Sequence, residues 1–216
     1  MRLYLMRHGE TEWNTKGLIQ GSTDVPLNEN GRRLAELTRE GFKAEGISFD
    51  RIFASPLVRA YETARIVTQD IKDAKIEREE RVREMSFGRY EGVSIRETGI
   101  NPVYANINNF FVSPKSYVPE EGCESYEDAE SRIRSFCSDK LFPIADSVKS
   151  VLVVCHGAII RSFLKYLLNI KPDELWDIRQ PNCCVNIFDI NDGRAEVIEL
   201  SRLFYDEEFI PKRKYT

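Results

Sequence analysis

The chain has 216 residues, of which 42% are hydrophobic and 31% charged, a balance typical of a folded domain that is not disordered. Its formal net charge of −4 argues against a nucleic-acid-binding surface, which needs a basic stripe. No apolar run approaches the roughly 18 residues of a membrane span, and Arg7, His8 and Glu10 interrupt the first one, so we expect neither membrane partner nor signal peptide. Five cysteines without paired metal-type spacing indicate reduced thiols and a cytoplasmic location.

Strand-like runs alternate with helical patterns along the chain. The predicted strands cover about residues 2–7, 51–54, 76–82, 150–155, 183–190 and 194–200. Helices are expected after the N-caps Asn28, Ser55 and Ser125, and another follows His156. This alternation predicts a three-layer α/β/α sandwich with a mainly parallel sheet. The turn at 191–193 predicts a hairpin of the last two strands, so the sheet is mixed at one edge.

Residues 86–124 interrupt this alternation. The stretch is rich in glycine, proline and aromatic side chains, and it is longer than an ordinary connection. We expect a lid-like insertion that covers a site, within a single domain of residues 1–216 that ends in a tail at 203–216. Packing of the aromatic side chains onto the edge of the core is the alternative.

Two apolar runs end in the same way, with a histidine followed by glycine. Residues 3–9 read Leu-Tyr-Leu-Met-Arg-His-Gly and residues 151–157 read Val-Leu-Val-Val-Cys-His-Gly, and they contain both histidines of the chain. A strand that ends in a glycine turn presents its last side chain at the carboxyl edge of the sheet, where open α/β folds bind ligands. We therefore expect His8 and His156 to meet at one site. Arg7 indicates an anionic ligand such as phosphate.

His8 is the candidate nucleophile. A neutral imidazole attacks phosphorus, and neighbouring arginines lower its pKa so that the neutral form is present near pH 7. His156 would donate a hydrogen bond to a phosphoryl oxygen. Arg59, expected near the start of a helix, could reach the same phosphate. A surface ion pair of Arg59 with Glu62 or Glu36 is the alternative.

Glu84 follows the third predicted strand and is the candidate acid. Departure of an alkyl oxygen needs a proton, which a glutamate with a raised pKa supplies. Apolar contact with Met85 and Phe87 would raise that pKa. A purely structural ion pair with Arg7 or Arg59 is the alternative.

A metal site competes with this interpretation. The two histidines together with Cys155, Glu84 or Asp24 could hold zinc. The arginines would repel the cation, however, and the chain has no HxH, HxxxH or CxxC spacing. We therefore expect no metal and no cofactor. No Walker-type phosphate-binding loop occurs either.

These motifs, in this order, resemble the histidine phosphatase (phosphoglycerate mutase-like) superfamily. The matching blocks are Met6–Asn14, Gln20-Gly21, Asp24–Gly31, Ser55–Ala60, Glu84–Gly88 and Val154–Gly157. The resemblance implies a phosphohistidine intermediate on His8. It also implies that the phosphate pocket is formed by Arg7, Arg59 and His156. Glu84 would be the acid that later serves as the base for water. Asn14, Gln20 and Gly21 stand where the family often contacts phosphate or substrate.

The resemblance favours the phosphatase branch over the mutase branch. Ser86–Gly92 lacks the histidine and lysine that are usual after the acid in the cofactor-dependent mutases, and it is similar to the small phosphatases. We therefore predict a metal-independent phosphomonoesterase, a hydrolase, that acts on small phosphorylated metabolites. A 2,3-bisphosphoglycerate-dependent phosphoglycerate mutase is the alternative. A phospho-ligand-binding protein without catalysis is disfavoured, because every reactive residue is present. The substrate and the oligomeric state stay open.

Overall fold

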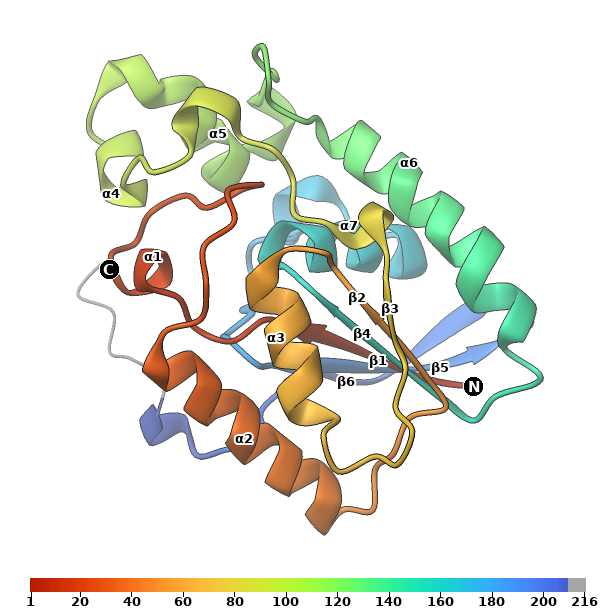
Figure 1. Cartoon of the computed structure of the whole chain (residues 1–216). Coiled ribbons are helices and arrows are strands. Elements are labelled where there is room, and N and C mark those ends of the chain that lie inside the picture. Colours follow the sequence, from red (N-terminus) through yellow and green to blue (C-terminus); the bar gives the residue numbers. More distant parts are fainter. Residues whose placement is uncertain (210–216) are drawn as a thin grey trace.

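A six-stranded sheet forms the centre of the computed structural model, which describes residues 1–209 (Figure 1). The strands are β1 (Arg2–Arg7), β2 (Arg51–Ala54), β3 (Ile76–Arg78), β4 (Ser150–Cys155), β5 (Val185–Asn191) and β6 (Arg194–Arg202). Their order is β3-β2-β4-β1-β5-β6. Strands β1 to β4 are parallel to one another, β5 is antiparallel to β1, and β6 is antiparallel to β5. The predicted mixed, mainly parallel sheet and its terminal hairpin are confirmed.

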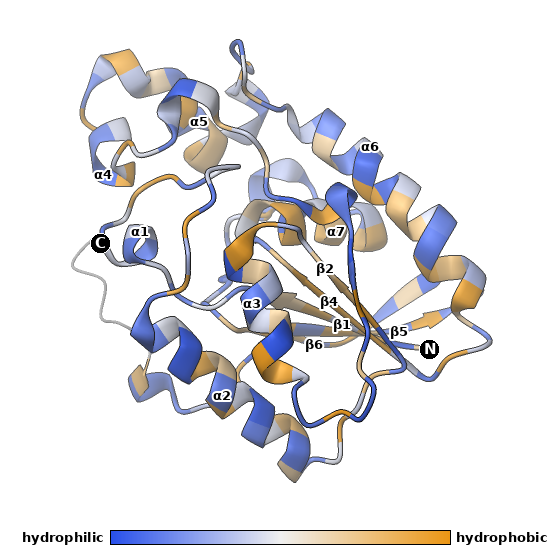
Figure 2. Cartoon of the chain, in the orientation of Figure 1, coloured by the Kyte–Doolittle hydropathy of each residue, from blue (hydrophilic) through white to orange (hydrophobic). Residues whose placement is uncertain are grey.

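Helices cover both faces of this sheet. They are α1 (Glu12–Thr15), α2 (Glu29–Ala44), α3 (Val58–Val67), α4 (Ile95–Thr98), α5 (Ala105–Val112), α6 (Tyr126–Phe136) and α7 (Gly157–Leu168). Alternate residues of β1 enter two separate apolar clusters: Leu3 and Leu5 pack with α6 and α7, whereas Tyr4 and Met6 pack with α2 and α3. Figure 2 shows hydrophobic residues on the central strands and hydrophilic residues along much of α2. The three-layer arrangement follows from strands that are apolar on both faces.

The register of the two central strands positions the histidines. Arg7 at the end of β1 pairs with Cys155 at the end of β4. The next residues, His8 and His156, therefore leave the sheet at the same level. The His8 backbone stays attached on both sides, because its N–H donates to Cys155 O (3.0 Å) and its carbonyl accepts from Cys183 N (3.3 Å).

Two elements differ from the sequence-based prediction. β3 ends at Arg78 rather than at residue 82, because Glu80–Val82 form a 3-10 turn. The Glu79 carboxylate accepts a hydrogen bond from Arg81 N (3.1 Å), which stabilises that turn in place of a strand. The assignment of Ser55 as a helix N-cap is also wrong: Leu57 occupies the N-cap position and α3 begins at Val58.

The stretch 86–124 carries short helices on the side of the molecule where the parallel strands end (Figure 1). Aromatic contacts attach it to the rest of the fold. Phe110 of α5 stacks on Tyr126 of α6 (4.6 Å between ring centroids) and contacts Trp176 edge-on (5.5 Å). Its description as a lid, and the single-domain boundary 1–216, stay predictions. Residues 203–209 of the predicted tail are described, and 210–216 lie outside the described residues.

We expect Gly31→Ala to destabilise the fold. A Cβ atom at Gly31 would lie 2.1 Å from the carbonyl oxygen and 2.6 Å from the nitrogen of Glu10. These are backbone atoms of the loop after His8, so the clash can be relieved only if that loop moves. The free energy of unfolding in urea should fall by about 3 kcal/mol.

Gly99→Ala is the matched control, because a Cβ atom there meets nothing closer than 3.7 Å. It should leave the unfolding midpoint almost unchanged. Equal midpoints for the two variants would show that the contact between Gly31 and Glu10 is not tight.

Candidate active site

The predicted site residues meet where β1 and β4 end. They surround a cavity of about 340 Å³. The predicted residues that line it are Arg7, His8, Asn14, Gln20, Gly21, Arg59 and Glu84. His156 stands behind His8, with 5.1 Å between the two ring centroids. Thus the structure brings all eight residues together from segments that are far apart in the sequence.

His8 is buried, and one of its ring nitrogens is fixed by the backbone. Nδ1 lies 2.6 Å from the carbonyl oxygen of Gly9, a group that only accepts hydrogen bonds. Nδ1 therefore carries the proton, and Nε2 of the neutral ring has a free lone pair. Burial lowers the pKa of His8 well below its usual range, and the positive charges of Arg59 and Arg7 lower it further. The ring is neutral near pH 7 and Nε2 is available as a nucleophile.

His156 is also buried and neutral. Its Nε2 lies 2.7 Å from the Ser55 hydroxyl, and its Nδ1 is buried without a hydrogen-bond partner in residues 1–209. Burial lowers the pKa of His156 well below its usual range, as do Arg59 and His8. If Ser55 donates to Nε2, the proton of the neutral ring stands on Nδ1. The imidazole can then donate one hydrogen bond to an anion.

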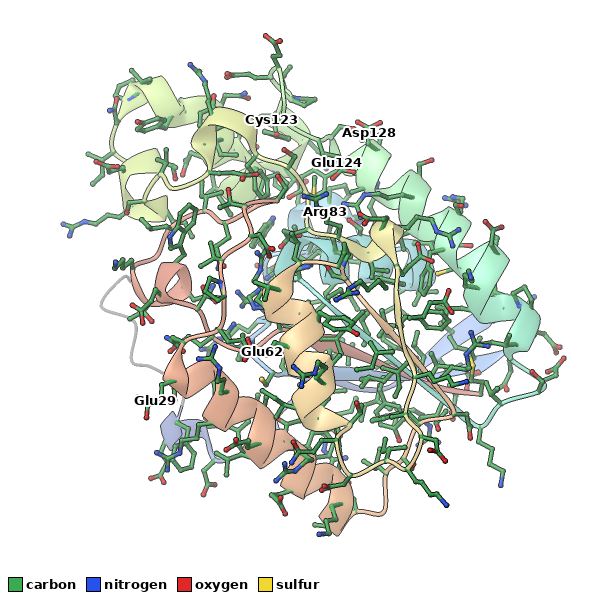
Figure 3. All side chains as sticks on the ribbon, viewed as in Figure 1. Glu29, Glu62, Arg83, Cys123, Glu124 and Asp128 are labelled. Atoms are coloured by element: carbon green, nitrogen blue, oxygen red, sulfur yellow. The ribbon has the colours of Figure 1, made fainter. Side chains whose placement is uncertain are left out.

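Arg59 points inward from the first turn of α3 and is fully buried. Its guanidinium donates to the carbonyl oxygens of Thr23 (2.8 Å) and Gly21 (2.7 Å), and Nε has no partner in the described part of the chain. Burial lowers the pKa of Arg59 to about 10, so the group stays cationic near pH 7. The alternative of a surface pair is wrong, because Arg59 is fully buried, and Glu62, which lies toward α2 (Figure 3), accepts from Arg32 of that helix at 2.7 Å.

Glu84 reaches the site six residues beyond the end of β3 and lies at the N-terminus of α7. Its carboxyl oxygens accept from the backbone N–H groups of Met85 (3.0 Å), Ala158 (3.3 Å) and Ile159 (3.3 Å). Burial raises the pKa of Glu84 above its usual value, although Arg59 and these N–H groups oppose that shift. A carboxyl group with a raised pKa next to a candidate nucleophile can give and take a proton.

Several residues that support the site were missed by the sequence analysis. Asn182 Nδ2 lies 3.1 Å from His8 O and 3.2 Å from Gly9 O, and the Thr63 hydroxyl accepts from Gly9 N at 2.9 Å. The Glu91 carboxylate holds the 22–23 segment through N–H bonds of 2.8 and 2.9 Å. Thr63 and Glu91 accompany the blocks Ser55–Ala60 and Glu84–Gly88 that resemble the family, but the sequence analysis assigned neither of them a role. Asn182 lies in a loop before β5, where no local pattern marks it.

The side chains considered for zinc have other partners. Asp24 Oδ1 accepts from Val58 N at 2.7 Å, and Cys155 is fully buried in β4, where burial raises the pKa of its thiol. Within residues 1–209, no three His, Cys, Asp or Glu side chains gather in a metal-binding group. All five cysteines are free thiols. No helix of this part of the chain has both the length and the apolarity to cross a membrane.

Residues 3–202 match the description of the histidine phosphatase superfamily, branch 1. The chain belongs to this superfamily, and its α/β fold matches structures of the same superfamily.

Its relatives include phosphatases and mutases. A Hydrogenobacter thermophilus protein, provisionally named phosphoserine phosphatase 2, is 30% identical over 207 residues, which cover 96% of this chain and 98% of that protein. A crystal structure of mutant phosphoserine phosphatase from Entamoeba histolytica with phosphoserine has 28% identity and a TM-score of 0.75, and covers 93% of this chain and 96% of that one. The 2,3-bisphosphoglycerate-dependent phosphoglycerate mutase of Dichelobacter nodosus is 27% identical, with 88% of each chain covered.

Proposed function

We propose that the protein is a metal-independent phosphomonoesterase that works through a phosphohistidine on His8. The observation that carries this proposal is one arrangement: Nε2 of a neutral His8, the buried cation of Arg59 and the protonatable Glu84 face one cavity. Relatives named as phosphoserine phosphatases support a small phosphate ester as the substrate. A cytoplasmic location is part of the proposal and agrees with five reduced cysteines.

The first half-reaction forms the phosphohistidine. Arg7 and Arg59 bind the phosphoryl oxygens, which brings the phosphorus atom to Nε2 of His8. The P–N bond forms as the ester P–O bond breaks, and Glu84 gives its proton to the departing alcohol oxygen. His156 donates from Nδ1 to a phosphoryl oxygen as charge shifts toward it.

The second half-reaction returns the enzyme to its starting state. Glu84, now a carboxylate, takes a proton from a water molecule, and the water oxygen attacks phosphorus. The P–N bond breaks, inorganic phosphate leaves, and the electron pair returns to Nε2 of His8. Proton and charge balance because the proton that Glu84 gave to the alcohol is replaced by the proton from water.

Three further residues are proposed to bind the phosphate. The Asn14 side-chain oxygen already accepts from Thr11 N and from Asn182, which leaves its NH₂ group to donate elsewhere. The Gln20 oxygen likewise accepts from the Thr11 hydroxyl at 2.9 Å. Both amides therefore present donors to the cavity that they line. Gly21 has φ +53°, and a Cβ atom there would lie 2.2 Å from Glu91 Oε1, so only glycine fits.

A phosphate-release assay with a panel of phosphomonoesters in EDTA tests this proposal. Chelator-resistant release of phosphate is the expected result. The panel includes 3-phosphoglycerate with a trace of 2,3-bisphosphoglycerate. Interconversion of 3- and 2-phosphoglycerate without phosphate release would assign the chain to the mutase branch instead.

A further inference from the structure

The cavity has an apolar part next to its phosphate-binding end. An aromatic wall and an aliphatic strip form this part. The aromatic wall consists of Phe87, Phe110, Phe111 and Trp176, and the aliphatic strip of Leu18, Ile19 and Ile95. Neither set takes part in the mechanism above.

The aromatic wall is rigid because its rings hold one another. Phe110 contacts Phe111 at 5.2 Å and Trp176 at 5.5 Å, and Phe111 contacts Trp176 at 5.0 Å, all edge-on. The Trp176 indole N–H donates to the Tyr126 hydroxyl at 2.9 Å, so the indole turns its polar atom away from any ligand. Phe87 and Phe110 are almost fully buried, so the ring surface that a ligand can reach comes from Phe111 and Trp176, and this surface favours aromatic partners.

Backbone hydrogen bonds hold the aliphatic strip in place. Ile19 N donates to Val93 O (2.9 Å), and Ile95 N donates to Gly17 O (2.8 Å), so the 17–19 loop is joined to the start of α4. Ile95 is 43% exposed although it is a large aliphatic side chain that lines the cavity. A ligand that covered it would remove apolar surface from water.

Of the two cations near these apolar surfaces, one is bound to backbone carbonyls and the other is exposed. Arg161 lines the cavity, but its guanidinium donates to the carbonyl oxygens of Leu175 (3.0 Å), Gly157 (2.8 Å) and Ile178 (3.1 Å). Arg179 is exposed, so water screens its charge. No lysine lines the cavity in the described part of the chain.

We propose that the leaving group of the substrate is an alcohol that carries an aromatic ring and no carboxylate. This inference rests on the proposed phosphatase function and specifies its substrate class. The rings of the aromatic wall and the carbons of the aliphatic strip offer no hydrogen-bond donor to the carboxylate of a substrate such as phosphoserine. A cavity of about 340 Å³ holds a phosphate group together with a ring-sized body.

Binding of non-hydrolysable phosphonates tests the preference without relying on turnover. We expect 2-phenylethylphosphonate to bind about 30-fold tighter than ethylphosphonate in calorimetry, as burial of one phenyl ring implies. We expect 3-phosphonopropanoate to bind no tighter than ethylphosphonate. Equal affinities for the phenylethyl and ethyl compounds, or tightest binding of the carboxylate, would overturn the inference.

Turnover of the matching esters separates this inference from the proposed function. The ratio of kcat/KM for 2-phenylethyl phosphate to that for ethyl phosphate should also be about 30. Both are primary alkyl esters, so leaving-group chemistry differs little. Phosphate release with a ratio near 1 overturns only the leaving-group inference. Absence of release from every ester overturns the phosphatase proposal. In that case the phosphonate affinities still show whether the cavity prefers an aromatic group.

Two variants on α5 test whether the aromatic wall is the source of the preference for an aromatic leaving group. Phe111→Ala removes one ring of the aromatic wall and should lower the kcat/KM ratio about fivefold. Val112→Ala changes the neighbouring residue, which is 68% exposed and does not line the cavity, and it should leave the ratio unchanged. Equal ratios for the two variants would exclude the aromatic wall as the source of the preference.

Discussion

Replacement of His8 by alanine is expected to lower kcat for phosphate release by at least about 10⁴-fold, because the covalent route is lost with the nucleophile. Because Nδ1 of His8 donates to the Gly9 carbonyl, Nε2 carries no proton and is the ring nitrogen that can act as the nucleophile at the cavity. The variant should also fail to retain radiolabelled phosphate when the reaction is quenched in alkali, where phosphohistidine persists.

His156→Asn is the matched control for this experiment. It removes the other buried imidazole of the pair but leaves the nucleophile in place. It should turn over slowly and still carry label on His8. Thermal unfolding of both variants shows whether either has lost its fold. A folded His8→Ala variant that kept most of its turnover would contradict the covalent mechanism.

Glu84→Gln is expected to lower kcat/KM for alkyl phosphates by about 10³-fold, because the departing alkoxide loses its proton donor. The loss should be smaller with 4-nitrophenyl phosphate, whose leaving group needs no proton. Glutamine keeps the size of the side chain and can still accept from Met85 N, so the fold should survive. Glu80→Gln, on an exposed side chain nearby, should have no effect.

The pH dependence of the same variants gives an independent check. Glu84 acts as an acid, so kcat/KM of the unmodified enzyme should fall as pH rises through the raised pKa of Glu84. Protonation of the nucleophile begins only as pH falls through the lowered pKa of His8, so it does not cause a decline with rising pH. In Glu84→Gln the alkaline decline should flatten. A decline that persisted unchanged would assign it to another group.

The sequence was sufficient to predict the sheet and the side chains that meet at the cavity, because both depend on local patterns. Apolar runs that end in His-Gly indicate strands, and parallel strands share a carboxyl edge, so these patterns alone predict that His8 and His156 meet. The hairpin at 191–193 follows from turn residues alone. The end of β3 was misplaced because the bond from Arg81 N to Glu79 competes with the ladder there.

The supporting residues could not be predicted, because their effect arises from contacts between distant segments. Asn182 reaches the His8 loop across a sequence separation of 174 residues, and Ser55 reaches His156 across 101. An asparagine in a loop or a serine before a proline has many possible roles. Only the folded chain shows which atoms they meet.

The backbone of His8 is attached to β4 on one side and to the loop before β5 on the other, and this has a consequence for how specificity can diverge. The position of the nucleophile is set by backbone bonds to Cys155 and Cys183, and these do not depend on the side chains around the leaving group. The surfaces that line the apolar part of the cavity, where we propose that the leaving group binds, come from the 17–19 loop, the 86–124 stretch and Trp176. Substitutions there can alter the preferred alcohol while the chemical step keeps its geometry. New substrates can thus be acquired by gradual change in these segments alone.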